Sequence, residues 1–436
     1  MAKRSSSRID STTGEFTATV SSTPDELLMA ALSRGGDALE TGRYLISFRE
    51  GMEEDGRNSL QSQGLRIADA RDFEGQAASL EAAGDADVMY FPELGVALAS
   101  GPAVEARMSN EASAFSTQDA VELIEPEYFV FAQNSEYLRG FLSAANTIAR
   151  DLGASGAAPP IDEELDAEAL GVTWGLNACR VPQSTRSGSG IKVAVLDTGM
   201  DVGHPDFAGR AITTNTFVGQ PVQDLNGHGT HCIGTSCGTK SPAGTTPRYG
   251  IAFGARIFVG KVLSNSGSGT SAGVLAGMNW AIAQRCEVIS MSLGSQSPVQ
   301  AAYTNAGAAA LRNGCLIIAA AGNAGSNTGS PANSPTIMSV ASLDSNLSPS
   351  SFSNFGKIEI AAPGRDIFSS WPRPTKYKSI SGTSMATPHV AGCAALWAQT
   401  SSSLRGQNLW RRLQSSAKRL PLPASKVGAG LVQAPN

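Results

Sequence analysis

Five short runs of apolar residues, separated by stretches that suit helices, constrain the fold of this chain more than any other feature. Continuous apolar runs of this kind are typical of strands buried on both faces of a parallel sheet. Helical stretches at 270–285 and 301–312 lie between them. The pattern therefore predicts a doubly wound parallel sheet with helices on both faces. The runs are residues 191–196, 257–262, 288–292, 316–320 and 337–341.

The residues before this region differ in composition and pattern. Residues 1–42 are rich in Ser, Thr and charge, which predicts a flexible arm. Residues 43–133 follow the order βαββαβ, which is typical of a small ferredoxin-like α+β domain. Residues 134–170 combine a Gly- and Pro-rich stretch with an acidic segment and indicate an exposed linker. The doubly wound domain is then expected over 171–436.

Charge and hydropathy exclude some classes of protein. The net charge is -5 and no run of Lys or Arg is long enough to follow a phosphate backbone, so nucleic acid is not an expected partner. No apolar run reaches the roughly 18 residues that a membrane span needs. The basic start lacks an apolar stretch behind it, so no Sec signal is expected, and the compartment stays open between the cytoplasm and unconventional export. A monomer is expected. The six cysteines leave free thiols and one or two disulfides both open.

Three polar residues fall at strand ends or helix starts, where ligands gather in open α/β sheets. Asp197 ends the run 192–196, His231 lies in a glycine-flanked segment that leads into a helix, and Ser384 begins a helical stretch. Taken singly, such residues are more often turn formers or helix caps. Together they suit nucleophilic catalysis, because a serine needs an imidazole to take its proton and the imidazole needs a carboxylate.

The segments that carry these residues resemble the three catalytic signatures of the subtilisin-like serine proteases, the subtilases. The segments are 195–199, 227–231 and 382–392, in the order Asp, His, Ser. The resemblance covers about 171–436. It implies a subtilisin-like fold and a serine endopeptidase that acts on proteins or peptides and requires no cofactor for catalysis.

The resemblance also implies a role for each site residue. Ser384 would be the nucleophile, His231 the general base, Asp197 the residue that orients the imidazole, and Asn323 the side-chain donor of the oxyanion hole. Substrate would lie between two groove edges and an S1 pocket. The residues implied for these are Ser268, Gly269, Ser292, Leu293, Gly294, Ala320, Ala321, Gly322 and Gly329. Because none of them carries a charge, a broad preference for large apolar P1 side chains is expected.

Two further residues bear on metals and reactivity. Cys232 directly follows His231, as in the proteinase K-like branch of the family, and a mercurial-sensitive thiol and an inert buried one are both open. Asp206 lies where relatives can carry a calcium ligand. The loop 238–244 offers no Asn or acid to complete such a site, so structural calcium is in doubt and the metal content is unknown.

Residues from about 43 to 132 resemble the inhibitory propeptides of subtilases. This implies a self-processing zymogen whose last strand, at 128–131, fills the groove like a substrate and whose propeptide acts as an inhibitor. A permanent accessory domain is the alternative. Two other functions compete: a subtilisin-like transpeptidase or macrocyclase, and a catalytically silent peptide-binding pseudoprotease. No obvious insertion shields an acyl-enzyme, and all the expected catalytic residues are present, which argues against both.

Overall fold

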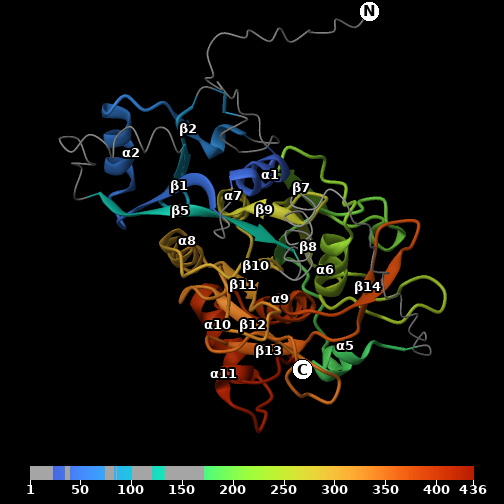
Figure 1. Ribbon diagram of the computed structural model, residues 1–436. Coiled ribbons are helices and arrows are strands. Elements are labelled where there is room, and N and C mark those ends of the chain that lie inside the picture. The colour runs from blue at the N-terminus through green and yellow to red at the C-terminus, as the bar shows by residue number, and fades with distance from the viewer. Residues whose placement is uncertain (1–22, 35–39, 74–82, 85, 101–119, 133–170) are drawn as a thin grey trace, which may run out of the picture.

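The fold comes from a computed structural model that describes residues 23–34, 40–73, 83–84, 86–100, 120–132 and 171–436 (Figure 1). Within this part the chain forms three sheets, with seven, six and two strands. In the six-stranded sheet, β9 (Ser268–Thr270) of the C-terminal part pairs with β5 (Val121–Phe131) of the N-terminal part. The predicted linker at 134–170 lies outside the described residues, so its structure stays a prediction.

The C-terminal part is built on a seven-stranded sheet in which every pair of neighbouring strands is parallel. The first strand of this sheet along the chain, β6 (Lys192–Asp197), has later strands on both sides, as the prediction of a doubly wound sheet requires. In spatial order they are β13 (Ile360–Pro363), β12 (Met338–Leu343), β11 (Leu316–Ala320), β10 (Val288–Met291), β6 (Lys192–Asp197), β8 (Arg256–Lys261) and β7 (Ile212–Thr216).

All five predicted apolar runs are strands of this sheet, and each is buried along nearly its whole length. The two strands without such a run are those at the edges. β7 has the sequence Ile-Thr-Thr-Asn-Thr and is half exposed, because an edge strand has a neighbour on one side only. β13 is short and ends at Pro363, which cannot donate to a further ladder.

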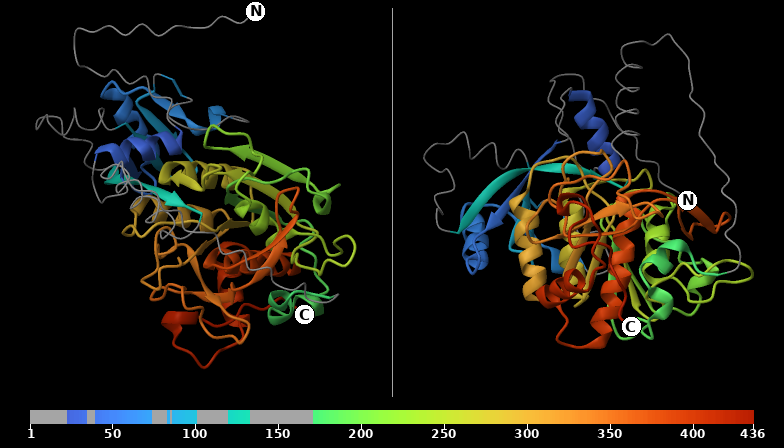
Figure 2. Two further views of the ribbon diagram at one scale, coloured as in Figure 1. Left: turned by 45° about the vertical axis from the view of Figure 1, so that its right-hand side comes forward. Right: turned by 90° about the horizontal axis from the view of Figure 1, so that it is seen from below.

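Helices cover both faces of the sheet and pack against alternating strand residues. Val193 and Val195 of β6 belong to the core under α6, α9 and α10, whereas Ala194 and Leu196 belong to the core under α7 and α8. Figures 1 and 2 show α9 and α10 in red on the side of the sheet opposite the blue N-terminal part. The helices are α5 (Trp174–Ala178), α6 (His228–Cys237), α7 (Ser271–Ala283), α8 (Ala301–Arg312), α9 (Thr383–Thr400), α10 (Gly406–Ser416) and α11 (Ala424–Val427).

The N-terminal part holds a smaller sheet with the order β2-β3-β4-β1-β5. Without the short parallel edge strand β2, this is the ferredoxin-like arrangement, in which the first and third of the four strands lie in the centre. The second helix of that pattern falls on 101–119, outside the described residues. The elements are β1 (Glu40–Phe48), α2 (Glu53–Ser62), β2 (Ile67–Asp69), the 3₁₀ turn η1 (Ala70–Phe73), β3 (Val88–Phe91), β4 (Val96–Ala99) and β5 (Val121–Phe131).

One region differs from the sequence-based expectation. Residues 24–34 form the helix α1 (Pro24–Arg34), and β1 already begins at Glu40, so the prediction of a flexible arm over 1–42 is wrong for these residues. A capping box starts α1: the Thr23 hydroxyl accepts from the Glu26 N–H, and a Glu26 carboxylate oxygen accepts from the Thr23 N–H at 2.8 Å. None of the helices in the described ranges is long and apolar enough to cross a bilayer.

Where α9 packs against α6, Gly392 has no space for a side chain. A Cβ at Gly392 would lie 2.7 Å from the Ile251 Cβ and 3.0 Å from the Ser236 carbonyl oxygen, so the backbones meet only because a side chain is missing. Gly273 in α7 is the matched case with room, since its nearest contact would be 3.6 Å away.

We therefore expect Gly392→Ala to lower the free energy of unfolding by about 1–3 kcal/mol through overpacking. Gly273→Ala should be neutral or stabilising by up to about 1 kcal/mol, because alanine is the better helix former. Urea unfolding of both variants in a Ser384→Ala background, which removes the expected nucleophile, measures this difference. Equal effects of the two substitutions would show that the helix crossing is not close-packed.

Candidate active site

The site lies where β6 ends and the helices α6 and α9 begin. Asp197 is the last residue of β6, and only 1% of its surface is exposed. One of its carboxylate oxygens accepts from the Thr198 N–H at 2.7 Å and from His228 Nδ1 at 2.7 Å. The strand thus delivers a buried carboxylate to the first residue of α6.

The imidazole beside Asp197 belongs to His228 and not to His231. The prediction of His231 as the partner of Asp197 is wrong. His231 lies three residues further into α6, where its Nε2 contacts the carbonyl oxygens of Ile367 at 2.9 Å and Lys378 at 3.2 Å. These carbonyls belong to the hairpin of β14 (Ile367–Ser370) and β15 (Tyr377–Ile380), so His231 fastens this hairpin to α6.

The two histidines also differ in charge. Burial disfavours the charged ring of both. At His231 it lowers the pKa to about 3. At His228 the charges and hydrogen bonds of Asp197 and Cys232 together outweigh burial and raise the pKa well above its usual value. His228 Nε2 is buried and has no hydrogen-bond partner among the described residues.

A buried carboxylate that the sequence reasoning missed holds the start of α6 in place. Asp224 is fully buried and accepts from the backbone N–H groups of Asn226, Gly227 and Thr230 at 2.8–3.0 Å and from the Thr230 hydroxyl at 2.7 Å. It therefore caps α6 and suits the positive end of the helix dipole. An acidic residue shortly before the start of a helix can cap it, and this is the sequence signal that could have identified Asp224.

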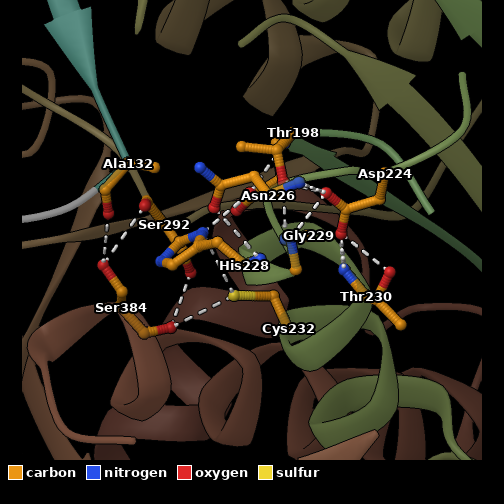
Figure 3. Close-up of polar contacts among 12 residues, drawn as sticks. Ala132, Thr198, Asp224, Asn226, His228, Gly229, Thr230, Cys232, Ser292 and Ser384 are labelled. Carbon is orange, nitrogen blue, oxygen red and sulfur yellow. Dashed lines mark hydrogen bonds and ion pairs between the residues drawn. The ribbon is translucent and has the colours of Figure 1, made fainter. Parts of the chain in front are cut away.

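The chain can turn into α6 only at a glycine. Gly227 has φ 102°, which disfavours any residue with a Cβ, and a Cβ there would lie 2.3 Å from the Trp371 ring. The Thr198 hydroxyl completes the junction, because it accepts from the Gly229 N–H at 2.8 Å and donates to Asp224 at 3.0 Å. His228 is thus held by both the strand and the turn (Figure 3).

Ser384 is the second residue of α9 and 4% exposed. Its hydroxyl lies 3.3 Å from the Ala132 carbonyl oxygen and 3.2 Å from the Ser292 carbonyl oxygen (Figure 3). Pro388, four residues on, has no N–H to donate to the Ser384 carbonyl. The Ser292 hydroxyl donates to this carbonyl at 2.7 Å and the Cys232 thiol at 3.6 Å, which fixes the serine backbone.

Asn323 lies beside the start of α9, as predicted. Its Oδ1 accepts from the Thr383 N–H and the Thr383 hydroxyl, both at 2.8 Å. This fixes the orientation of the amide, so Nδ2 remains as the donor. A Cβ at Gly382 would lie 3.1 Å from that Nδ2, so the glycine leaves the amide room.

Two rims of a groove hold the strand β5 in place. On one side β9 (Ser268–Thr270) pairs with it, Val130 opposite Gly269 and Phe131 opposite Ser268. On the other side Phe131 and Gly294 exchange both backbone hydrogen bonds, at 3.0 and 3.1 Å. The predicted groove residues Ser268, Gly269 and Gly294 therefore contact an extended segment by strand addition.

The remaining predicted substrate residues lie close to these rims. Ser292 reaches Ser384 through two contacts, and Leu293 shares a buried cluster with Val130. The segment 320–322 leads to Asn323, and the Gly329 N–H donates to the Ala321 carbonyl at 3.0 Å. The expected wall and floor of S1 therefore adjoin.

Gln296 is a residue near S1 that the sequence reasoning missed. Its Nε2 lies 3.4 Å from a Cβ placed at Gly322 and 3.3 Å from one placed at Gly329. It thus brings a polar amide to the region expected to be apolar, and nothing in the sequence pattern marks it.

The family follows from known proteins that the chain resembles. The model of the subtilase family matches residues 188–430. The chain belongs to the subtilase family. An alkaline protease of Alkalihalobacillus alcalophilus is 40% identical over 280 residues, which are 63% of this chain and 71% of the relative. Subtilisin Savinase of Lederbergia lenta is 40% identical over 273 residues, 61% of this chain and 98% of the relative.

A solved structure supports the same assignment. A cold-adapted subtilisin-like serine proteinase aligns with a TM-score of 0.53 and 35% identity, over 61% of this chain and 99% of its own. The predicted subtilisin-like α/β fold is thereby confirmed, and the subtilase is a serine endopeptidase that acts on protein substrates.

The structure describes the surroundings of the cysteines and of Asp206 in this subtilase. All six cysteines are described, buried and not joined in disulfides. Burial raises the pKa of Cys232, so its thiol stays protonated. Asp206 accepts from the hydroxyls of Tyr249 at 2.5 Å and Tyr377 at 3.0 Å. Both hydroxyls reach the same carboxylate oxygen, so these contacts leave the expectation about structural calcium undecided.

The raised pKa of His228 predicts the pH dependence of hydrolysis. Below its pKa the ring is charged and cannot accept a proton, so kcat/KM should rise with pH through a pKa above the 6.5 of free histidine. A pH profile of kcat/KM with a neutral peptide substrate measures this limb. A limb at or below pH 6.5 would show that Asp197 does not control the imidazole.

Proposed function

We propose that this subtilase cleaves peptide bonds with Ser384 as nucleophile, His228 as general base and Asp197 as the residue that orients the imidazole. The observation that carries the proposal is the buried contact of 2.7 Å between His228 Nδ1 and Asp197. It puts the proton on Nδ1 and leaves Nε2 free to accept the serine proton. His231 cannot replace it, because its Nε2 is engaged by two carbonyls.

The reaction then follows from the geometry. Ser384 Oγ attacks the substrate carbonyl while its proton moves to His228 Nε2. The oxyanion that forms accepts hydrogen bonds from Asn323 Nδ2 and the Ser384 N–H, which lies at the positive end of α9. His228 returns the proton to the leaving amine, and an acyl-enzyme remains. Water, deprotonated by His228, releases the acyl group and restores the serine.

We also propose that the chain is made as a latent, self-processing precursor. Support comes from β5, which lies in the groove and brings the Ala132 carbonyl to within 3.3 Å of Ser384 Oγ. Two carboxylates of β5 cap helices of the C-terminal part: Glu125 accepts from the N–H groups of Ala301 and Ala302, and Glu127 from that of Ala272. The segment before 133 would thus be the inhibitor and 171–436 the protease, with the cut in the predicted linker or just before it.

A broad preference for large apolar P1 side chains remains part of the proposal. The residues at 320–322 and Gly329 are small and carry no charge, which supports this preference. Gln296 adds one polar amide, so amide-bearing P1 side chains would be accepted as well.

The test compares two histidine variants of one protein. His228→Ala should reduce labelling by a fluorophosphonate, and peptide hydrolysis, by at least about 10³-fold, because Ser384 loses its base. His231→Gln keeps a donor for the hairpin carbonyls and should retain most of the labelling rate. Thermal unfolding of both variants separates loss of chemistry from loss of fold. Loss of labelling only in His231→Gln, with both variants folded, would overturn the assignment.

A further inference from the structure

Three serine hydroxyls on the rim of the groove converge on one carboxylate oxygen. Oδ1 of Asp25, in the first turn of α1, accepts from Ser264 Oγ at 2.9 Å, from Ser266 Oγ at 2.6 Å and from Ser268 Oγ. We call Ser264, Ser266 and Ser268 the rim hydroxyls. Hydrogen bonds to an ionised acceptor are roughly twice as strong as neutral ones, so this cluster suits a carboxylate.

With α1 and β5 in place, Ser264 and Ser268 are buried, whereas Ser266 is exposed. Ser264 and Ser268 are 0% and 1% exposed, and the Ser264 N–H donates to the Ser268 carbonyl at 2.7 Å, which closes the turn between them. Burial lowers the pKa of Lys261 to about 8, and the charges of Asp224, Asp197 and Asp25 oppose that shift. A negative side chain at this rim therefore meets three hydroxyl donors.

The same helix covers the outer face of β5. Side chains alternate along a strand, so Val130 points toward the core with Leu293, and Phe129 and Phe131 point away from it. Phe129 and Phe131 would be open to water without α1. Instead Leu28 packs on them, and they are only 0% and 6% exposed.

The contacts of Asp25 and of Leu28 both hold the pair of strands β5 and β9. Ser268 pairs with Phe131 through the backbone of β9, and its hydroxyl donates to Asp25, while Leu28 rests on the Phe131 side chain. When β5 leaves the groove, α1 must therefore either move with it or lose its apolar contacts with Phe129 and Phe131.

We propose that the rim hydroxyls form a carboxylate-binding site, that Asp25 occupies it, and that α1 thereby clamps β5 in the groove. The biological role of this clamp rests on the proposed function, because clamping β5 matters only if the protease is made in a latent form. The ligand class is a side-chain carboxylate presented by a helix of the same chain.

The test is hydrogen exchange on the full-length Ser384→Ala protein, which stays intact whether or not the enzyme is active. We expect Asp25→Ala, and more mildly Asp25→Asn, to speed exchange of the amides of β5 and β9 roughly tenfold, because several hydrogen bonds to a charge are lost. Met29→Ala is the matched control on α1, since that side chain is 59% exposed and should leave the rates unchanged.

Unchanged exchange in β5 and β9 of Asp25→Ala would overturn the clamp, whatever the catalytic result. Equal acceleration by Met29→Ala would assign the effect to the helix as a whole and would also overturn the role of the rim hydroxyls. The same Asp25 variants with Ser384 present should reach activity sooner after refolding and end at the activity of the unmodified chain. Absence of activity in every protein would instead count against the proposed function.

Discussion

The contact between Asp197 and His228 is the interaction on which the rest of the site depends. It joins the end of β6 to the first residue of α6, and both side chains are buried away from water. An ionised pair away from water is costly unless its remaining hydrogen bonds are made. Thr198 supplies one of them to Asp197 Oδ1, whereas Asp197 Oδ2 has no partner among the described residues. Asp224 fixes the backbone that carries His228.

The nucleophile is positioned by a second constraint, which comes from Pro388. Because proline cannot donate to the carbonyl one turn earlier, the Ser384 carbonyl is left for Ser292 and Cys232. Ser292 belongs to the rim that also faces β5. The serine, the rim and the segment in the groove are therefore coupled through a few hydrogen bonds, and α1 extends that coupling to the other rim through Asp25.

The sequence allowed most of the fold to be predicted, because the features used were local. A buried parallel strand needs a continuous apolar run, and all five runs became strands, whereas the half-polar β7 gave no such signal. The histidine was different. His228 and His231 lie in one glycine-flanked segment, and the pattern alone does not say where α6 begins. The helix starts at His228, and only that start decides which ring meets Asp197.

The helix α1 illustrates a second limit. It has only 11 residues, and an isolated helix of that length is marginal in water. It is ordered by contacts with residues about 100 and 240 positions away along the chain, which no local pattern reveals. The asparagine, by contrast, was found from its motif, and its place beside Thr383 agrees with the expectation.

The most direct test of the central claim is the intact mass of the purified full-length protein beside its Ser384→Ala variant. If β5 presents the chain to an assembled triad, the unmodified protein loses an N-terminal piece that ends close to Ala132 or in the following segment, and the variant keeps its full mass. Full-length mass in both proteins, with no reaction of Ser384 toward a fluorophosphonate, would contradict the account.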